Sequence, residues 1–148
     1  MRRSISTLLL VAVIAAGAAG CSDDTPTIPT TPNTPGTPMT FTETFSGAIN
    51  TNGAATSSFT AKTGGTVVAT LTAVAPDATT TVGLSLGTWT GTACQVVIAN
   101  DAAVQGAIIT GTVTSAASLC VRIYDIGKLT GNVNYTITVV RPSLTGTD

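Results

Sequence analysis

The stretch that decides the fold reads Thr66-Val67-Val68-Ala69-Thr70-Leu71-Thr72-Ala73-Val74. Val67, Ala69 and Leu71 alternate with Val68, Thr70 and Thr72. A period of two residues predicts a β-strand with one buried face. Gly64-Gly65 before the stretch and Pro76-Asp77 after it are turn-forming and strand-breaking residues. We therefore expect one strand over 66–74.

Similar short Val/Ile/Thr/Leu runs fill the chain on both sides of this strand, with Gly, Asn, Asp or Pro between them. No window has the apolar period of a helix. The expected strands are 40–49, 54–61, 66–74, 81–87, 94–99, 107–114, 119–124 and 133–140, with Asn100-Asp101 ending the fifth and with 107–114 and 119–124 forming a hairpin. Eight such strands predict an all-β, antiparallel β-sandwich of jelly-roll type.

Four segments carry a resemblance to a known family: Phe41–Gly47, Gly65–Thr72, Cys120–Tyr124 and Asn134–Val139. They resemble the bacterial pre-peptidase C-terminal (PPC) domain, a small β-sandwich appended to secreted proteases and other exported proteins. The resemblance covers 41–140 and implies the same sandwich fold. In this chain Asp77–Thr80 replaces the more polar, Asp-containing segment of many members, and no protease precedes the domain.

The N-terminus has the layout of a secretory signal. Met1-Arg2-Arg3 is basic and Leu8–Ala16 is apolar, and an uninterrupted apolar stretch of about 12 residues is too short to span a bilayer. Ala18-Ala19-Gly20-Cys21 resembles the bacterial lipobox, with Ala18 at the position where Leu is usual. Cys21 is thus the expected lipidation site.

In a bacterial lipoprotein Cys21 carries a diacylglyceryl group and an acyl chain such as palmitate on its new N-terminus, and several acyl chains give stable membrane anchoring. The alternative is an ordinary secretory signal with a free or paired Cys21. Ser22, rather than Asp, follows the cysteine, which resembles lipoproteins sent on to the outer membrane. The expected location is the bacterial cell envelope.

Between the anchor and the domain lies a Thr/Pro-rich linker. Prolines recur at every third residue from Pro26 to Pro38, which matches the three residues per turn of polyproline II. At about 3.1 Å per residue this spacer reaches roughly 40 Å. A ligand for a proline-binding groove is the alternative. The expected domains are 1–20 signal peptide, 21–39 acylated cysteine and stalk, 40–141 PPC-like sandwich and 142–148 tail.

Charge and composition exclude several functions. The net charge is −1 and basic residues do not cluster, which argues against nucleic acid and against a polybasic membrane patch. The chain has no His, which removes Ser-His-Asp and Cys-His catalysis and the usual zinc sites. Of the domain's acidic residues Glu43, Asp77, Asp101 and Asp125, the last three stand where turns favour Asp. We expect no catalytic residue, no enzyme and no cofactor.

Cys94 and Cys120 are expected to form a structural disulfide, because both lie in predicted strands of an exported protein. Closing a loop of this length stabilises a domain by on the order of 3 kcal/mol. A metal pair and a redox-active couple are the alternatives. The first would need further ligands, and the second usually has more closely spaced cysteines.

The weaker candidates are ligand-binding side chains. Trp89, in a glycine-flanked loop, and Tyr124 are candidates for stacking on a sugar, although we favour Trp89 as a plug over one end of the sandwich. Asn100, Asp101 and Asp125 are candidates for a calcium site. Arg122 is expected to pair with Glu43 or Asp125 across strands.

The sequence favours a non-catalytic, lipid-anchored envelope module that presents a β-sandwich for protein interaction or envelope structure. The alternative is a carbohydrate-binding module that uses an exposed Trp89. The expected partners are the membrane, through the lipid anchor, and an envelope protein or a glycan.

Overall fold

The computed structural model describes residues 39–144, which form eight β-strands. They are β1 (Met39–Ile49), β2 (Ala54–Ala61), β3 (Gly65–Ala75), β4 (Val82–Trp89), β5 (Cys94–Ala103), β6 (Ile108–Val113), β7 (Ala117–Tyr124) and β8 (Val133–Ser143). Cys21, the predicted signal peptide and the linker lie outside the described residues. Within 39–144 there is no helix that is long and apolar enough to cross a membrane.

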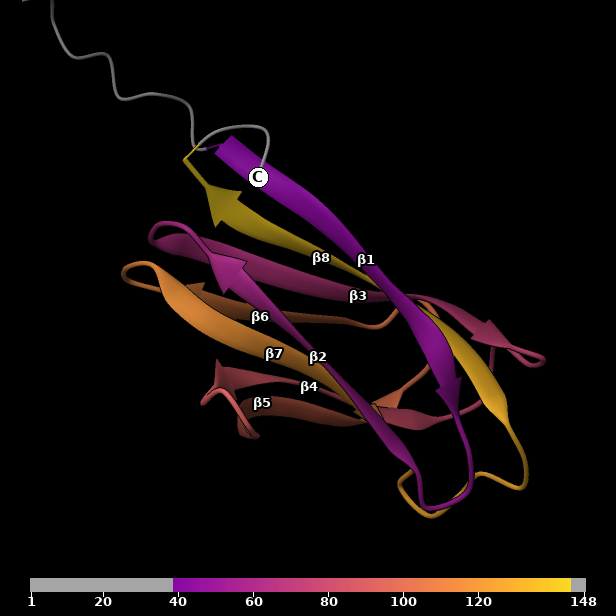
Figure 1. Ribbon diagram of the computed structural model, residues 1–148. Helices are drawn as coiled ribbons and strands as arrows, with labels where there is room; N and C mark the ends of the chain where they lie inside the picture. The colour runs from indigo at the N-terminus through magenta and orange to yellow at the C-terminus, as the bar shows by residue number, and fades with distance from the viewer. Residues whose placement is uncertain (1–38, 145–148) are drawn as a thin grey trace, which may run out of the picture. The chain divides into compact units, whose positions relative to one another are not determined.

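The strands form two four-stranded sheets with the orders β1-β8-β3-β6 and β2-β7-β4-β5, and every pairing is antiparallel. The sheets lie as two layers (Figure 1). This order is the jelly-roll arrangement, so the predicted fold class is confirmed. It leaves β1 and β6 at the edges of one sheet, and β2 and β5 at the edges of the other.

The core lies between the sheets and follows from the period of two residues. Val67, Ala69 and Leu71 of β3 are buried, and a register shift between Leu71 and Ala73 then brings Val74 to the buried face. The expected inward residues of the fourth and eighth strands are also buried: Val82, Leu84, Leu86, Tyr135, Ile137 and Val139. The alternation therefore identified the core correctly.

Three sequence expectations about the strands are wrong. The predicted hairpin of 107–114 and 119–124 does not form, because β6 pairs with β3 while β7 lies between β2 and β4 in the other sheet. The fifth strand does not end at Asn100-Asp101 but continues to Ala103, with register shifts that accommodate the extra residues. The last strand, expected over 133–140, likewise continues through Pro142, which pairs with Thr40, to Ser143.

Candidate functional site

The outer face of β4 carries almost no side chain. Apolar residues of this strand alternate with Gly83, Ser85 and Gly87, so these three positions face away from the core. All three are buried nevertheless, and Ser85 has no exposed surface. Groups from the neighbouring strands β7 and β5 therefore cover the outer face of β4.

The first covering group is Tyr124 of β7. A Cβ atom on Gly83 would lie 2.2 Å from the Tyr124 ring, so the ring lies across this glycine. The Tyr124 hydroxyl donates a hydrogen bond to Oδ1 of Asp101 on β5, and the Arg122 guanidinium carbon lies 5.3 Å from the ring centroid. Burial and the bond to Asp101 raise the pKa of Tyr124 from 10.0 to about 12. Asp101 is thus a strand residue that ties β5 to β7, not the turn residue that its sequence predicted.

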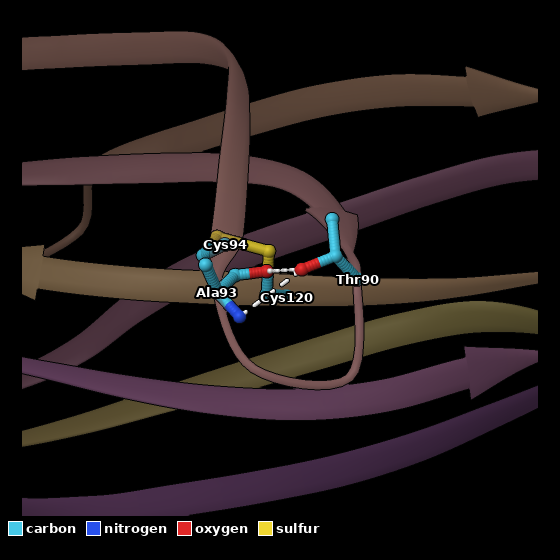
Figure 2. The surroundings of a disulfide bond; sticks show 4 residues. All are labelled: Thr90, Ala93, Cys94 and Cys120. Carbon is cyan, nitrogen blue, oxygen red and sulfur yellow. Dashed lines mark hydrogen bonds between the residues drawn. A yellow bond between two sulfur atoms is a disulfide. The ribbon is translucent and has the colours of Figure 1, made fainter.

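The second tie between β7 and β5 is the predicted disulfide, which joins Cys94 to Cys120 (S–S 2.08 Å). Figure 2 shows the adjoining turn, in which Thr90 and Ala93 bond to each other through their backbones and the Thr90 hydroxyl. Gly87 pairs with Cys120, and a Cβ atom there would lie 2.0 Å from the Gln95 carbonyl oxygen. The backbone at the start of β5 therefore leaves no space for a side chain at this glycine.

Trp89 and Tyr124 do not form a common surface for a sugar. Trp89 is not in a loop: it is the last residue of β4, where it pairs with Cys94. Its side chain is half-buried. Tyr124 of β7 pairs with Gly83, which precedes Trp89 by six positions on β4. At about 3.3 Å per residue the two positions are roughly 20 Å apart. A role for Trp89 alone, as plug or as sugar contact, stays a prediction.

The three calcium candidates are engaged in separate hydrogen bonds. Asn100 Oδ1 accepts from Ala102 N at 2.9 Å, and Asp101 accepts from Tyr124. Asp125 accepts from four backbone N–H groups, those of Asn52, Gly127, Lys128 and Leu129, at 2.8–3.1 Å. N–H donors on a carboxylate compete with a cation for its lone pairs. Among residues 39–144 no three His, Cys, Asp or Glu side chains meet as a metal site.

The remaining carboxylates also have local partners. Glu43 Oε2 lies 3.4 Å from Arg141 Nε. Among the described residues Arg122 pairs with neither Glu43 nor Asp125, so its expected ion pair is wrong. Asp77 accepts bonds from the backbone N–H and the hydroxyl of Thr79, both at 2.8 Å, and these bonds lower its pKa. Each acidic side chain of the described residues therefore has a different hydrogen-bond or ion-pair partner.

A pocket of about 460 Å³ lies between the β3–β4 and β7–β8 loops. Its lining includes Asp77, Thr81, Lys128 and Asn132. None of its lining residues is aromatic, so it lacks the ring on which a sugar typically stacks.

Four of the six exposed large apolar side chains of the described residues lie at one edge of the sandwich, on β5, β6 and their connection, and the other two, Met39 and Leu144, lie beside the start of β1. Val97 is 71% exposed, Ile108 59%, Val96 47% and Val104 37%. At the opposite edge the exposed residues of β1 and β2 after Met39 are mainly Thr, Ser and Ala. Of the two pairs of sheet edges, the one formed by β5 and β6 therefore carries more of the exposed large apolar side chains.

An apolar pocket of about 140 Å³ opens at the same edge. Gly111 of β6 stands at an inward position, where a Cβ atom would lie 3.7 Å from Ile98 Cδ1 and 4.0 Å from Leu86 Cδ1. The missing side chain leaves the space, and the other lining residues are Val67, Gly87, Thr88, Val97, Thr112, Val113 and Leu119. We call these exposed residues and this pocket the β5–β6 edge.

Sequence reasoning missed the β5–β6 edge. Residues 94–113 contain one charged side chain, Asp101, but residues 44–61 of the opposite edge contain none. Charge therefore does not distinguish this edge strand from the others, although charged residues normally protect edges from pairing with other chains. The strand order was needed to show that β5 and β6 both lie at edges.

Comparison with known proteins does not assign the chain to a family. No family model matches it, and no curated protein matches it. Among solved structures it is similar to Aeromonas hydrophila PliG, a periplasmic lysozyme inhibitor of g-type lysozyme. The TM-score is 0.49 at 11% identity, over 69% of this chain and 86% of that one. A likeness of this size carries no argument about function.

Proposed function

We propose that this protein is a non-catalytic, lipid-anchored module of the bacterial cell envelope that binds another protein through the β5–β6 edge. The observation that carries the proposal is the contrast between the two edges of the sandwich. Val97 and Ile108 expose apolar surface on terminal strands at one edge, whereas hydroxyl side chains dominate the other. A large exposed apolar patch on a folded domain typically marks an interaction site.

Anchoring is the second part of the proposal and is supported by the sequence alone. The lipobox-like Ala18–Cys21 follows a short apolar run, and a Thr/Pro-rich linker separates it from the sandwich. A tethered domain has a high effective concentration near partners in the same membrane. A modest apolar edge is then sufficient for binding.

The test is site-specific photo-crosslinking of the full chain in the cells that produce it. A photoreactive amino acid replaces Val97 or Ile108 on the β5–β6 edge, and Thr42 of β1 or Ser58 of β2 serves as the matched exposed control on the opposite edge. We expect a discrete protein adduct from the first two positions and none from the controls. Adducts of equal yield at all four positions, or none at Val97 and Ile108, would overturn the proposal.

A further inference from the structure

We infer that the β5–β6 edge receives an extended, uncharged segment of a partner protein, which adds to β6 as a further strand and places one large apolar side chain in the pocket beside Gly111. The inference rests on the proposed protein-binding function and specifies the chemistry of the partner.

The size of the pocket selects a single side chain. Its volume is about 140 Å³, and an engineered cavity of about 150 Å³ binds benzene. A Leu or Phe side chain therefore fits, and a long acyl chain does not. The lining from Leu86, Ile98 and Leu119 is apolar, so filling the pocket removes apolar surface from water on both partners.

The pairing pattern selects β6 as the strand that the segment joins. β6 pairs with β3 without a register shift, residue by residue from Ile108 to Val113, so its outer edge presents regularly spaced backbone groups. β5 has two register shifts in its pairing with β4, and such irregularities interrupt the spacing that a new strand needs. Inward side chains of a strand beside β6 would point between the sheets, beside Gly111.

Charge complementarity selects an uncharged segment. The only charged residue of 94–113 is Asp101, and its carboxylate already accepts a hydrogen bond from Tyr124. A charged side chain placed against Val97 and Ile108 would lose water without gaining a counter-charge, which is unfavourable. Thr, Val, Leu and Phe are the residue types that fit an added strand here.

A second copy of this chain does not supply the missing side chain through its own β6. Of the inward residues of β6, Ile109 is 6% exposed and packs in its own core. Gly111 has no side chain, and Val113 packs against the core of its own sandwich. A different chain, with an unburied apolar residue, therefore fits the pocket better.

The experiment uses the full chain, as cells process it, in phospholipid nanodiscs with isotope-labelled Ile, Leu and Val methyl groups. Soluble, capped seven-residue peptides of alternating Thr and Val are titrated, with Leu, Phe or Ala at the central position. We expect the Leu and Phe peptides to shift the methyl resonances of Val97, Ile98 and Val113. The Ala peptide should bind about tenfold more weakly, because it buries less apolar surface.

Gly111→Val fills the pocket from within and should weaken binding of the Leu peptide about tenfold. Gly131→Val is the matched control, because a Cβ atom at Gly131 meets nothing within 4 Å, and it should bind like the unchanged chain. Circular dichroism and the intact disulfide report whether each variant folds. Gly111→Ala adds one methyl at ordinary contact distance and serves if Gly111→Val does not fold; it too should weaken binding.

Several outcomes would overturn the inference: equal binding of the Leu and Ala peptides, undiminished binding by folded Gly111 variants, or methyl shifts confined to β1 and β2. Self-association that Ile108→Lys abolishes, without peptide binding, would assign the edge to a second copy instead. If photo-crosslinking at Ile108 captures a protein but no peptide enters the pocket, the inference fails while the proposed function stands. If neither occurs, both fail.

Discussion

At Gly83 and Gly87 of β4, atoms from other strands occupy the space where a side chain would stand. The intruding group is different at the two positions. Over Gly83 it is the ring of Tyr124, and over Gly87 it is the backbone carbonyl of Gln95. A side chain can rotate away from an added methyl group, whereas a strand backbone moves only with its hydrogen bonds. The two glycines therefore differ in what a substitution costs.

We predict that Gly87→Ala destabilises the domain more than Gly83→Ala. Gly83→Ala displaces Tyr124 and loses its bond to Asp101, at a cost of about 1–2 kcal/mol. Gly87→Ala must shift the start of β5, at a cost of about 3 kcal/mol. Urea unfolding of both variants measures the difference. Adding Tyr124→Phe to Gly83→Ala should cost little more, because both remove the same bond. Equal destabilisation by the two glycine variants would contradict the prediction.

Asp125 makes the stability of the domain depend on pH in the acidic range. Its bond from Asn52 N–H, the largest effect, and those from the turn after β7 lower its pKa below 3.8. A group with a lowered folded-state pKa contributes stability that is present above 3.8 and is lost as the pH falls below it, through the folded-state value. Asp77 acts in the same pH range.

We therefore predict that Asp125→Asn lowers the melting temperature at pH 7 and makes stability fall less steeply between about pH 4 and pH 2. Thermal unfolding over this range measures the slope. Asp125→Asn combined with Asp77→Asn should flatten it further. A slope that Asp125→Asn leaves unchanged would mean that the four N–H bonds do not favour the ionised carboxylate.

At the scale of strands, the sequence predicts which residues form each strand and which face is buried, because both follow from the period of two. It does not predict pairing across the sandwich. Residues 114–116 are compatible with a hairpin, yet they connect β6 and β7 in different sheets. The Tyr124–Asp101 bond likewise depends on β4 lying between β7 and β5 with a glycine at 83. The apolar pocket could not be predicted for the same reason. Gly111 leaves a space in the core because Ile98 of the other sheet lies opposite it, and the sequence does not predict that contact.

Removal of the disulfide should act mainly on β5, an edge strand that pairs only with β4 within the described sheets. Cys94 and Cys120 are 26 residues apart, and loop-closure entropy for this length corresponds to about 3.5 kcal/mol. We predict a loss of about this size for the Cys94→Ser, Cys120→Ser double variant in urea unfolding. Native-state hydrogen exchange should show faster opening of β5 than of β7. Uniform acceleration over both strands would contradict a local role.

Gly111→Ala should stabilise the domain, because the new methyl group makes ordinary contacts with Ile98 and Leu86. The expected gain is about 1 kcal/mol, part of it from the reduced freedom of the unfolded chain. Gly131→Ala measures the contribution of the unfolded chain alone, because its methyl group would contact nothing within 4 Å. The urea midpoints of both variants measure the change in stability, provided that the slope of the unfolding free energy against urea concentration is unchanged. A gain for Gly111→Ala no larger than that for Gly131→Ala would show that the pocket cannot accept a methyl group.

At the scale of the whole chain, the two edges of the sandwich have separate roles in the proposed function. The described chain begins in β1, at the edge of its sheet that lies opposite β6. The linker from Cys21 therefore joins the sandwich at the edge rich in hydroxyl groups. In the proposed function the partner binds at the other edge, on β5 and β6.

We predict that Cys21 is the acylated residue. An alkyne-bearing fatty acid fed to the cells should label the unchanged chain, and mass spectrometry should find acylated Cys21 as the first residue of the mature protein. Cys21→Ser should abolish the label, because the serine hydroxyl cannot replace the thiolate that receives the diacylglyceryl group. Cys94→Ser is the matched control: it removes a cysteine that pairs with Cys120 and should keep the label. Labelling that survives Cys21→Ser, or a mature N-terminus elsewhere with a free Cys21 thiol, would favour an ordinary secretory signal and leave the sandwich without a lipid anchor.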